Sequence, residues 1–489
     1  MGVVSTATDA SSGARRQNFQ RFILGVIAVT ASFATVPGPA ASQPASQPTS
    51  PPTSQPASQP QRGTAAVQAF TNAVLIDGTG APAIEHATIV IRGDRIVSAG
   101  PGTSVSAPGG ARVTDLGGKV LMPGLADMHV HMMGGWDGVA TDILGYRRYL
   151  NALLYAGVTT VLDTGNVEPF IVQLRAEIAA GRLTGPRIYC VGPLIDGADP
   201  AWPPLSRAVA SVGQVPDVVR ALSRDHVDLI KAYVGLSHPV LERLVEEGKK
   251  ANLRVIIDQW QRNGSPDLVA DGIYGFAHLP TRKLSSADVE LMRDRKVAFI
   301  STLTVFESGS RRRLGNLGFL QDPLVRDTSP PAFLDGLRAE AARQLPQAET
   351  EKAQHWVGLL QNAMGNARAL AQSGVLLTAG TDAPYPGDMQ GEGLHRELEL
   401  LVEAGFTPLE AIAIATQNAA RFIGASDWGT IQPGKLATLI VVDGRPDRDI
   451  SQSRRVTAVY IAGRQIDRDA LKLSRQNDPG FEPISPVDF

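Results

Sequence analysis

The 489-residue chain is short of cysteine, of aromatic residues and of net charge. Its single cysteine, Cys190, excludes a disulfide within the chain and a cysteine-rich zinc site, so a bound metal would need His, Asp, Glu or modified Lys as ligands. The formal net charge is −2, and no basic stripe or charge run indicates a nucleic acid or an anionic membrane surface as a partner. What is present, 43% hydrophobic and 19% charged residues, is typical of a globular enzyme with one large and one smaller domain.

The first 64 residues are not expected to belong to the fold. Three arginines precede an apolar run at residues 22–36, and small residues follow it, which is the order of a secretory signal peptide. The run is shorter than the about 20 residues that span a bilayer, although an uncleaved membrane anchor is the alternative. Residues 42–64, rich in Ser, Gln and Pro, are predicted to be a disordered linker. We therefore predict a signal peptide over residues 1–41 and an exported protein, periplasmic or secreted.

The rest of the sequence changes its pattern twice. Residues 65–123 and 426–489 hold short alternating runs and turns typical of β-strands, whereas residues 124–425 alternate apolar runs with amphipathic helical stretches. The eight apolar runs of the middle region are Leu125–Met132, Thr159–Thr164, Arg187–Val191, Val227–Val234, Arg254–Trp260, Gly272–Leu279, Val297–Leu303 and Val375–Thr381. Eight strand–helix repeats predict a TIM (β/α)8 barrel. The fold class is therefore α/β, with a small β-sandwich domain formed from the N- and C-terminal segments on either side of the barrel.

Two histidines lie two positions apart in the first apolar run. Side chains at positions i and i+2 of a strand point to the same face, so His129 and His131 are expected to project together. They lie near the C-terminal end of the strand, where TIM-barrel active sites are found. Neutral imidazole is a common ligand for Zn²⁺ and similar ions. The pair alone is also compatible with one hydrogen-bonded ring and one exposed ring.

Three further runs place polar residues at or near their ends. Lys231 lies in the fourth run, where a buried cation needs a partner or a modification, unless it extends to the barrel mouth. His278 ends the sixth run and Asp382 follows the eighth. A carboxylate there can bind a metal and accept a proton from a metal-bound water. Ligand-type residues on four separate strands together predict a metal centre.

Taken together, these motifs resemble the amidohydrolase superfamily, particularly its imidazolonepropionase-like and Xaa-Pro dipeptidase-like members. The resemblance extends from about residue 70 to about residue 465. The segments that carry it are Ile76–Gly80, Pro123–His131, Ile230-Lys231, Ala277-His278, Gly380–Ala383, Gly405–Ala411 and Gly434–Ala437.

The resemblance implies a metal-activated hydroxide that attacks a carbonyl or phosphoryl centre. By this analogy His129, His131 and Asp382 would hold one metal ion, and Asp382 would be the general base that later protonates the leaving group. Lys231, carboxylated on its amine, would bridge to a second ion that His278 helps to hold. The expected cofactor is one or two divalent ions per chain, with Zn²⁺ as the default and Mn²⁺, Fe²⁺ or Co²⁺ as ions that fit the same ligands.

One position departs from the superfamily pattern. Where the fifth strand usually ends in histidine, this chain has Asp258, or Gln259 if the alignment shifts by one residue. Aspartate is a competent zinc ligand, so Asp258 is a candidate for the second ion. The alternative is a single-metal centre that lacks this site.

Two residues are candidates for substrate binding, and ordinary packing or surface positions are the alternatives. Tyr233 shares a strand face with Lys231, and His395 follows the eighth run.

We predict a metal-dependent hydrolase of carbon–nitrogen bonds in an amide-like small molecule, such as a dipeptide or a cyclic amide. Deaminase, lactonase and phosphotriesterase activities stay open within this class. The alternative function, suggested by Asp258, is a catalytically degraded protein that binds a small ligand without turnover. No nucleic acid, and no membrane for the mature domain, is expected as a partner.

Overall fold

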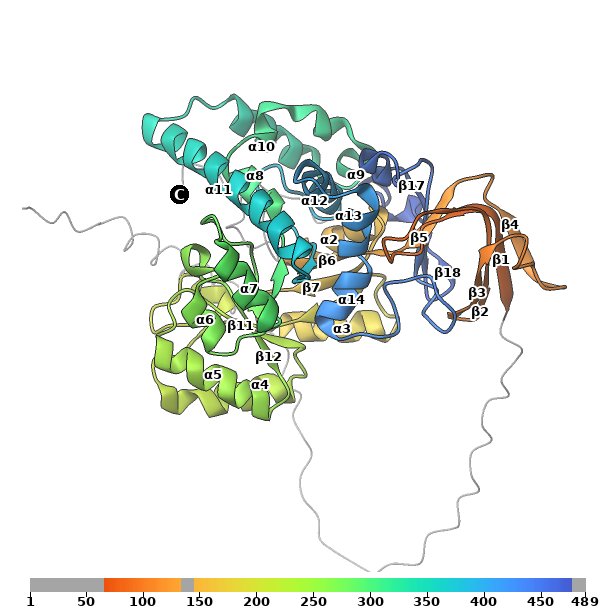
Figure 1. The fold of residues 1–489 in the computed structure, drawn as a ribbon. Helices are drawn as coiled ribbons and strands as arrows, with labels where there is room; N and C mark the ends of the chain where they lie inside the picture. The colour runs from red at the N-terminus through yellow and green to blue at the C-terminus, as the bar shows by residue number, and fades with distance from the viewer. Residues whose placement is uncertain (1–65, 133–144, 477–489) are drawn as a thin grey trace, which may run out of the picture. The chain divides into compact units, whose positions relative to one another are not determined.

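The computed structural model describes residues 66–132 and 145–476, and the structural statements below concern these residues (Figure 1). The predicted signal peptide and the predicted linker lie outside the described residues. Within the described parts of the chain, no helix combines the length and the hydropathy that crossing a membrane requires.

Strands from both ends of the chain form one mixed sheet. Its members are β1 (Val67–Leu75), β2 (Ile84–Arg92), β3 (Arg95–Pro101), β4 (Arg112–Asp115), β5 (Val120–Pro123), β16 (Leu439–Val442), β17 (Val456–Ile461) and β18 (Arg464–Gln465). The strand order is β18-β17-β16-β5-β1-β2-β3, and β4 pairs with β1. The antiparallel pairing of β5 with β16 joins the N-terminal strands to the C-terminal ones. Because hydrogen bonding places all eight strands in a single sheet, the predicted two-sheet sandwich is not confirmed.

This sheet has an apolar core of its own. Phe70 of β1 meets Tyr460 of β17 edge to face, with ring centroids 5.0 Å apart. Ile89 of β2 is buried in the same cluster. The two-residue turn Gly93-Asp94 joins β2 to β3, and Gly93 adopts a φ of 62°, which glycine tolerates without steric cost. Strand β2 buries five consecutive residues, and β5 and β16 are buried throughout, so these strands are covered on both faces.

Each of the eight apolar runs of the middle region contains a strand. These strands are β6 (Leu125–Val130), β7 (Val158–Asp163), β8 (Arg187–Cys190), β11 (Leu229–Ala232), β12 (Arg254–Ile257), β13 (Gly275–Phe276), β14 (Ala298–Ile300) and β15 (Leu376–Thr378). Two short strands that the sequence pattern did not predict, β9 (Leu194–Asp196) and β10 (Ser206–Ala208), lie between β8 and β11 in the chain.

The parallel strands form two sheets. One contains β6, β7 and β8, and the other has the order β10-β9-β11-β12-β13-β14-β15. Isolated backbone hydrogen bonds connect them: Asp228 N donates to Cys190 O at 2.8 Å, and Met128 N donates to Ala379 O at 2.9 Å. The α/β class and the eight repeats are thus observed, whereas the closed barrel is not confirmed.

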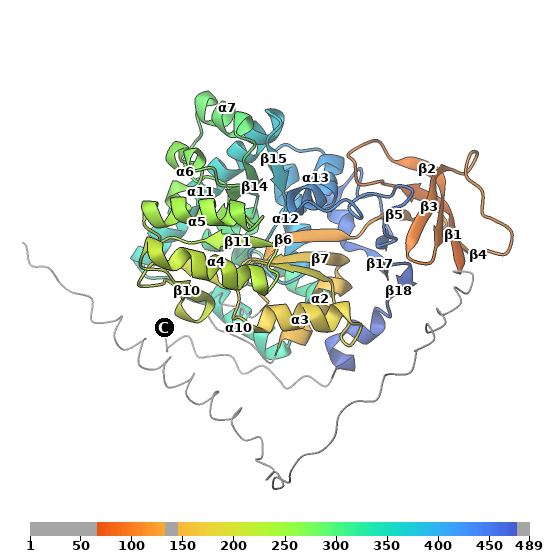
Figure 2. The same cartoon turned by 90° about the horizontal axis from the view of Figure 1, so that it is seen from below.

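Helices lie around these strands (Figures 1 and 2). They are α2 (Tyr146–Tyr155), α3 (Phe170–Ala179), α4 (Val215–Arg224), α5 (His238–Lys250), α6 (Pro266–Ala270), α7 (Ser286–Asp294), α8 (Leu303–Gly309), α9 (Pro323–Arg326), α10 (Pro331–Ala342), α11 (Gln347–Gln372), α12 (Glu392–Glu403), α13 (Pro408–Ile414) and α14 (Gln417–Ile423). Helix α4 shows why they form: Val215, Val219 and Leu222 share one buried stripe at helical spacing.

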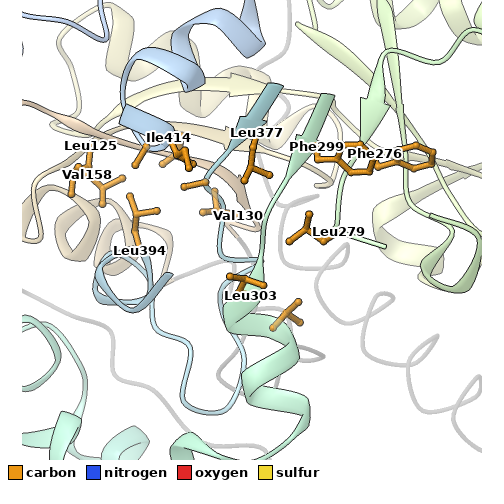
Figure 3. Packing of buried hydrophobic residues seen from close by; sticks show 14 of the residues in the cluster. Leu125, Val130, Val158, Phe276, Leu279, Phe299, Leu303, Leu377, Leu394 and Ile414 are labelled. Atoms are coloured by element: carbon orange, nitrogen blue, oxygen red, sulfur yellow. The ribbon is translucent and has the colours of Figure 1, made fainter. Parts of the chain in front are cut away.

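Apolar side chains fill the space between strands and helices. Leu125 of β6 and Val158 of β7 lie in one cluster with Leu394 of α12 (Figure 3). A second cluster, which includes Leu229, occupies the opposite face of the strands. Lys231 follows Leu229 by two positions and therefore shares its strand face. On this face the side chains change from apolar to polar toward the carboxyl ends of the strands.

Replacing Phe70 by alanine should lower the free energy of unfolding by about 3–5 kcal/mol, because it leaves a cavity in the core of the sheet. Urea denaturation followed by circular dichroism measures this. The control is Val113→Ala on β4, where the side chain is 53% exposed and the expected change is within about 0.5 kcal/mol. Equal effects of the two changes would contradict the assignment of this core.

Candidate functional site

Six of the residues predicted from the sequence meet in one cluster at the carboxyl ends of the parallel strands. They are His129, His131, Lys231, Asp258, His278 and Asp382. Five of the six are buried as whole residues, and the His131 side chain is 18% exposed. The cluster divides into two groups, and Asp382 lies close to residues of both.

The first group consists of two imidazoles and one carboxylate. Nε2 of His129 and Nε2 of His131 each lie 3.1 Å from Oδ1 of Asp382. Their Nδ1 atoms donate to backbone carbonyls, His129 to Ala277 at 2.9 Å and His131 to Gly165 at 2.8 Å. A carbonyl oxygen only accepts, so each Nδ1 carries a hydrogen. Each ring in its neutral form therefore presents the lone pair of Nε2 to the carboxylate.

The second group surrounds Asp258. Its Oδ2 lies 3.1 Å from Nε2 of His278 and 3.4 Å from Nζ of Lys231. Nζ of Lys231 also donates to Nε2 of His129 at 3.1 Å, and Nε2 of His278 lies 3.8 Å from Oδ2 of Asp382. The other carboxylate oxygen of Asp258, Oδ1, is buried and has no hydrogen-bond partner among the described residues. Asp258 thus points into the cluster with one oxygen free to bind.

The donor set fits a divalent metal ion. A nitrogen lone pair that faces a carboxylate oxygen at 3.1 Å is unfavourable unless a proton or a metal cation lies between them. His129, His278 and Asp382 each offer one ligand atom, and these atoms lie within 4.8 Å of one another. Two imidazoles and a carboxylate match the ligand types of catalytic zinc sites.

Burial controls how the first group ionises. Burial and the nearby ammonium of Lys231 lower the pKa of His129 to about 3, so this ring is neutral at pH 7. Burial opposes ionisation of Asp382, yet His129 and the other neighbouring imidazoles hold its pKa well below the usual range. Burial opposes protonation of His131, but its hydrogen bond to Asp382 raises its pKa above the usual value. The Asp382 carboxylate is therefore compensated by a proton on His131 or, in its place, by a metal cation.

A second buried carboxylate braces this group from behind. Oδ1 of Asp127 accepts hydrogen bonds from the backbone N–H of His129 at 3.2 Å and of Thr381 at 3.0 Å, while Oδ2 accepts from the Thr381 hydroxyl at 2.8 Å. Asp382 N donates to His129 O at 2.7 Å, and Asp382 adopts a φ of 70°, which is strained for a residue with a side chain. These bonds tie the first and last strands together and fix His129 relative to Asp382.

Tyr233 lies beside the cluster. Its ring centroid is 5.7 Å from Nζ of Lys231, which agrees with their shared strand face. The Tyr233 hydroxyl accepts a hydrogen bond from the indole N–H of Trp202 at 3.0 Å, so its own hydrogen is available to donate.

His395 does not join the cluster. It is fully buried on α12, with Nδ1 2.9 Å from the hydroxyl of Ser453 and Nε2 2.8 Å from the carbonyl of Ala156. Both ring nitrogens are engaged, so the structure contradicts the predicted contact with substrate. His395 instead fastens the C-terminal segment and the end of α2 to α12.

The structure adds aromatic residues that the sequence did not identify. Trp260 stacks on the ring of His278, and Phe306 and Trp356 lie against Trp260. Tyr385 lies near Asp382, and burial raises its pKa well above the usual value. The only sequence signal for Trp260 is its place two residues after Asp258, because no periodicity marks a loop residue.

Comparison with known proteins agrees with this fold. Residues 354–466, which include Asp382, match the amidohydrolase family. The chain is 25% identical to an imidazolonepropionase of Deinococcus radiodurans over 410 residues, which cover 78% of this chain and 92% of the relative.

Two further similarities are more limited, the first in the length of chain it covers and the second in sequence identity. The chain is 37% identical to an adenine deaminase of Nitratidesulfovibrio vulgaris over 115 residues, which cover 22% of this chain but only 19% of the relative. The crystal structure of a Xaa-Pro dipeptidase with bound methionine in the active site superposes with a TM-score of 0.66 at 22% identity, covering 82% of this chain and 100% of that one. This last likeness concerns the fold alone. Together with the family match, these findings confirm the resemblance to the amidohydrolase superfamily.

Replacing Thr381 by valine should weaken binding of a divalent metal by about 10- to 100-fold, because the side chain no longer holds Asp127 behind the ligands. Competition with a chromophoric chelator measures the affinity. Thr430→Val, a buried threonine outside the cluster, is the matched control and should leave the affinity unchanged. If both variants bound metal like the parent, the bracing role of Asp127 and Thr381 would be excluded.

Proposed function

We propose that this protein, which carries an amidohydrolase family segment, is a metal-dependent hydrolase that cleaves carbon–nitrogen bonds in amide-like small molecules. The observation that carries the proposal is the convergence of two Nε2 atoms on one carboxylate oxygen of Asp382 in a buried site. The relatives named as imidazolonepropionase and adenine deaminase support hydrolysis at carbon–nitrogen bonds as the reaction class.

The ligand groups are those that the resemblance to the amidohydrolase superfamily implies, and all their residues lie in the cluster. His129, His131 and Asp382 would hold one divalent ion, with Zn²⁺ as the default for this donor set. His278, Asp258 and a carboxylated Lys231 would hold a second ion if one binds. When bound, such an ion supplies Lewis acidity, which lowers the pKa of water and polarises a carbonyl oxygen.

Asp382 is proposed to move the proton. Its carboxylate is ionised, because the surrounding imidazoles hold its pKa well below the usual range despite burial. Oδ2 of Asp382 lies 3.8 Å from Nε2 of His278, whereas Oδ1 lies 3.1 Å from Nε2 of both His129 and His131. It would accept a proton from the attacking water and return it to the leaving nitrogen, which then departs as a neutral amine.

Tyr233 is proposed to orient the substrate. Its hydroxyl already accepts a hydrogen bond from Trp202, and the free O–H hydrogen would donate to an oxygen of the substrate. Burial raises the pKa of Tyr233 well above its ordinary value, so the hydroxyl keeps its hydrogen throughout the neutral range. A donor at this point would hold the scissile group against the ligand cluster.

A second candidate function is ligand binding without turnover. The observation that favours it is Asp258, an aspartate where the resemblance leads one to expect histidine. Its unpaired Oδ1 nevertheless gives the second group an oxygen ligand, so the enzyme is the better-supported proposal.

Replacing Asp382 by asparagine should reduce kcat by about 10²- to 10⁴-fold on any substrate that the parent hydrolyses, because asparagine accepts no proton. Amine release from a panel of dipeptides and cyclic amides by the metal-supplied protein measures this. Metal content, determined on the same samples, separates loss of the base from loss of the ion.

The matched control is Asp443→Asn, an exposed aspartate on the mixed sheet, which should keep parental activity. Full activity in the Asp382 variant would contradict its role as the base. Absence of turnover in the metal-loaded parent across the panel would favour the binding protein.

A further inference from the structure

We propose that Trp260, Trp356 and Phe306 form an aromatic wall of the substrate site, and that this wall selects substrates with a flat aromatic ring next to the scissile bond. The inference rests on the proposed function and names its substrate class. The three residues are called the aromatic wall below.

The rings of the wall contact one another and the ligand cluster. Trp260 stacks on His278 with centroids 4.5 Å apart and planes inclined by 17°. Trp356 of α11 meets Trp260 edge to face at 5.8 Å and 83°, and Phe306 of α8 does so at 6.2 Å and 90°. Phe306 and Trp356 are 6.0 Å apart. These separations lie in the range in which aromatic pairs attract.

The wall is close to the reacting position. Nε2 of His278 lies 3.1 Å from Asp258 and 3.8 Å from Asp382, and Trp260 covers one face of the same imidazole. A scissile bond held at the cluster is therefore about one ring width from the Trp260 indole. Trp260 and Trp356 are only partly buried, whereas Phe306 is fully buried and packs against both indoles.

The chain maintains the wall at some conformational cost. Trp260 adopts a φ of 38°, a conformation that residues with side chains rarely take. Gly309 lies under the ring of Trp356, and a Cβ at this position would be 2.4 Å from the ring, so a larger residue would displace it. The chain has five tryptophans, and two of them belong to this one wall. Packing of His278 alone needs neither a second indole nor a glycine beneath it.

The chemistry of the wall favours an aromatic ring over a saturated one. Indole and phenyl rings stack on, or meet edge-on, another aromatic ring and gain about 0.5–1.5 kcal/mol beyond the burial of area. A saturated ring of the same size buries similar area but has no such quadrupole.

Product-like acids test the proposal without requiring turnover. Isothermal titration of the metal-supplied full chain with benzoate and with cyclohexanecarboxylate compares two rings of similar size and equal charge. We expect benzoate to bind about 3- to 10-fold more tightly, as the aromatic contribution predicts. Phenylacetate and cyclohexylacetate form a second pair that moves the ring away by one methylene.

Four variants distinguish the wall from general packing. Trp260→Leu should abolish the preference for the aromatic acid, whereas Trp260→Phe, which restores a ring, should keep it. Trp428→Phe is the control, because Trp428 is buried against Tyr189 in a separate cluster. Trp356→Leu should weaken the preference and replaces the first variant if that one does not fold.

Any one of three results would overturn the aromatic wall. These are equal binding of the two acids by the parent, no binding of either acid, and an unchanged preference in Trp260→Leu. Metal content is measured on each variant. A parent that binds metal and hydrolyses its substrates but shows no aromatic preference refutes the wall and leaves the proposed function intact. A parent that binds benzoate selectively but shows no turnover supports the wall as a ligand site and refutes the hydrolase.

Discussion

The structure depends on one electrostatic constraint, the burial of the Asp382 carboxylate against two imidazole nitrogens. Asp382 faces His129 and His131 at 3.1 Å with almost no solvent to stabilise its charge. Removing such a group from water costs several kcal/mol unless a cation compensates it. A divalent ion would supply that compensation, and its need for three or more ligands would explain why residues on five different strands end at one place.

Hydrogen bonds from the scaffold hold the ligand side chains in position before any ion binds. Backbone carbonyls hold the Nδ1 hydrogens of the two imidazoles, and Asp127 ties the backbone of His129 to Thr381. Below the cluster the inner faces of the strands carry apolar side chains such as Leu229, which exclude water. Ligands that are held in place lose little freedom on binding, so the free energy of coordination is retained as affinity.

Much of this arrangement could be predicted from the sequence, because periodicity and strand-end positions are local signals. The eight apolar runs, the pairing of His129 with His131 and the shared face of Lys231 and Tyr233 follow from a two-residue repeat. His395 shows the limit: its partners, Ser453 and Ala156, are distant in sequence, and no local pattern reveals them. Local patterns also do not reveal where the parallel strands divide into two sheets. Nor do they reveal the position of Trp260, which depends on a loop conformation.

Metal content per chain tests the central claim most directly. The purified full chain, supplied with Zn²⁺ or Mn²⁺ and bicarbonate, is compared with a His129→Ala/His131→Ala double variant by elemental analysis. The account predicts at least about one ion per chain in the parent and almost none in the double variant. A parent without metal under these conditions, or a double variant that binds as much as the parent, would contradict it.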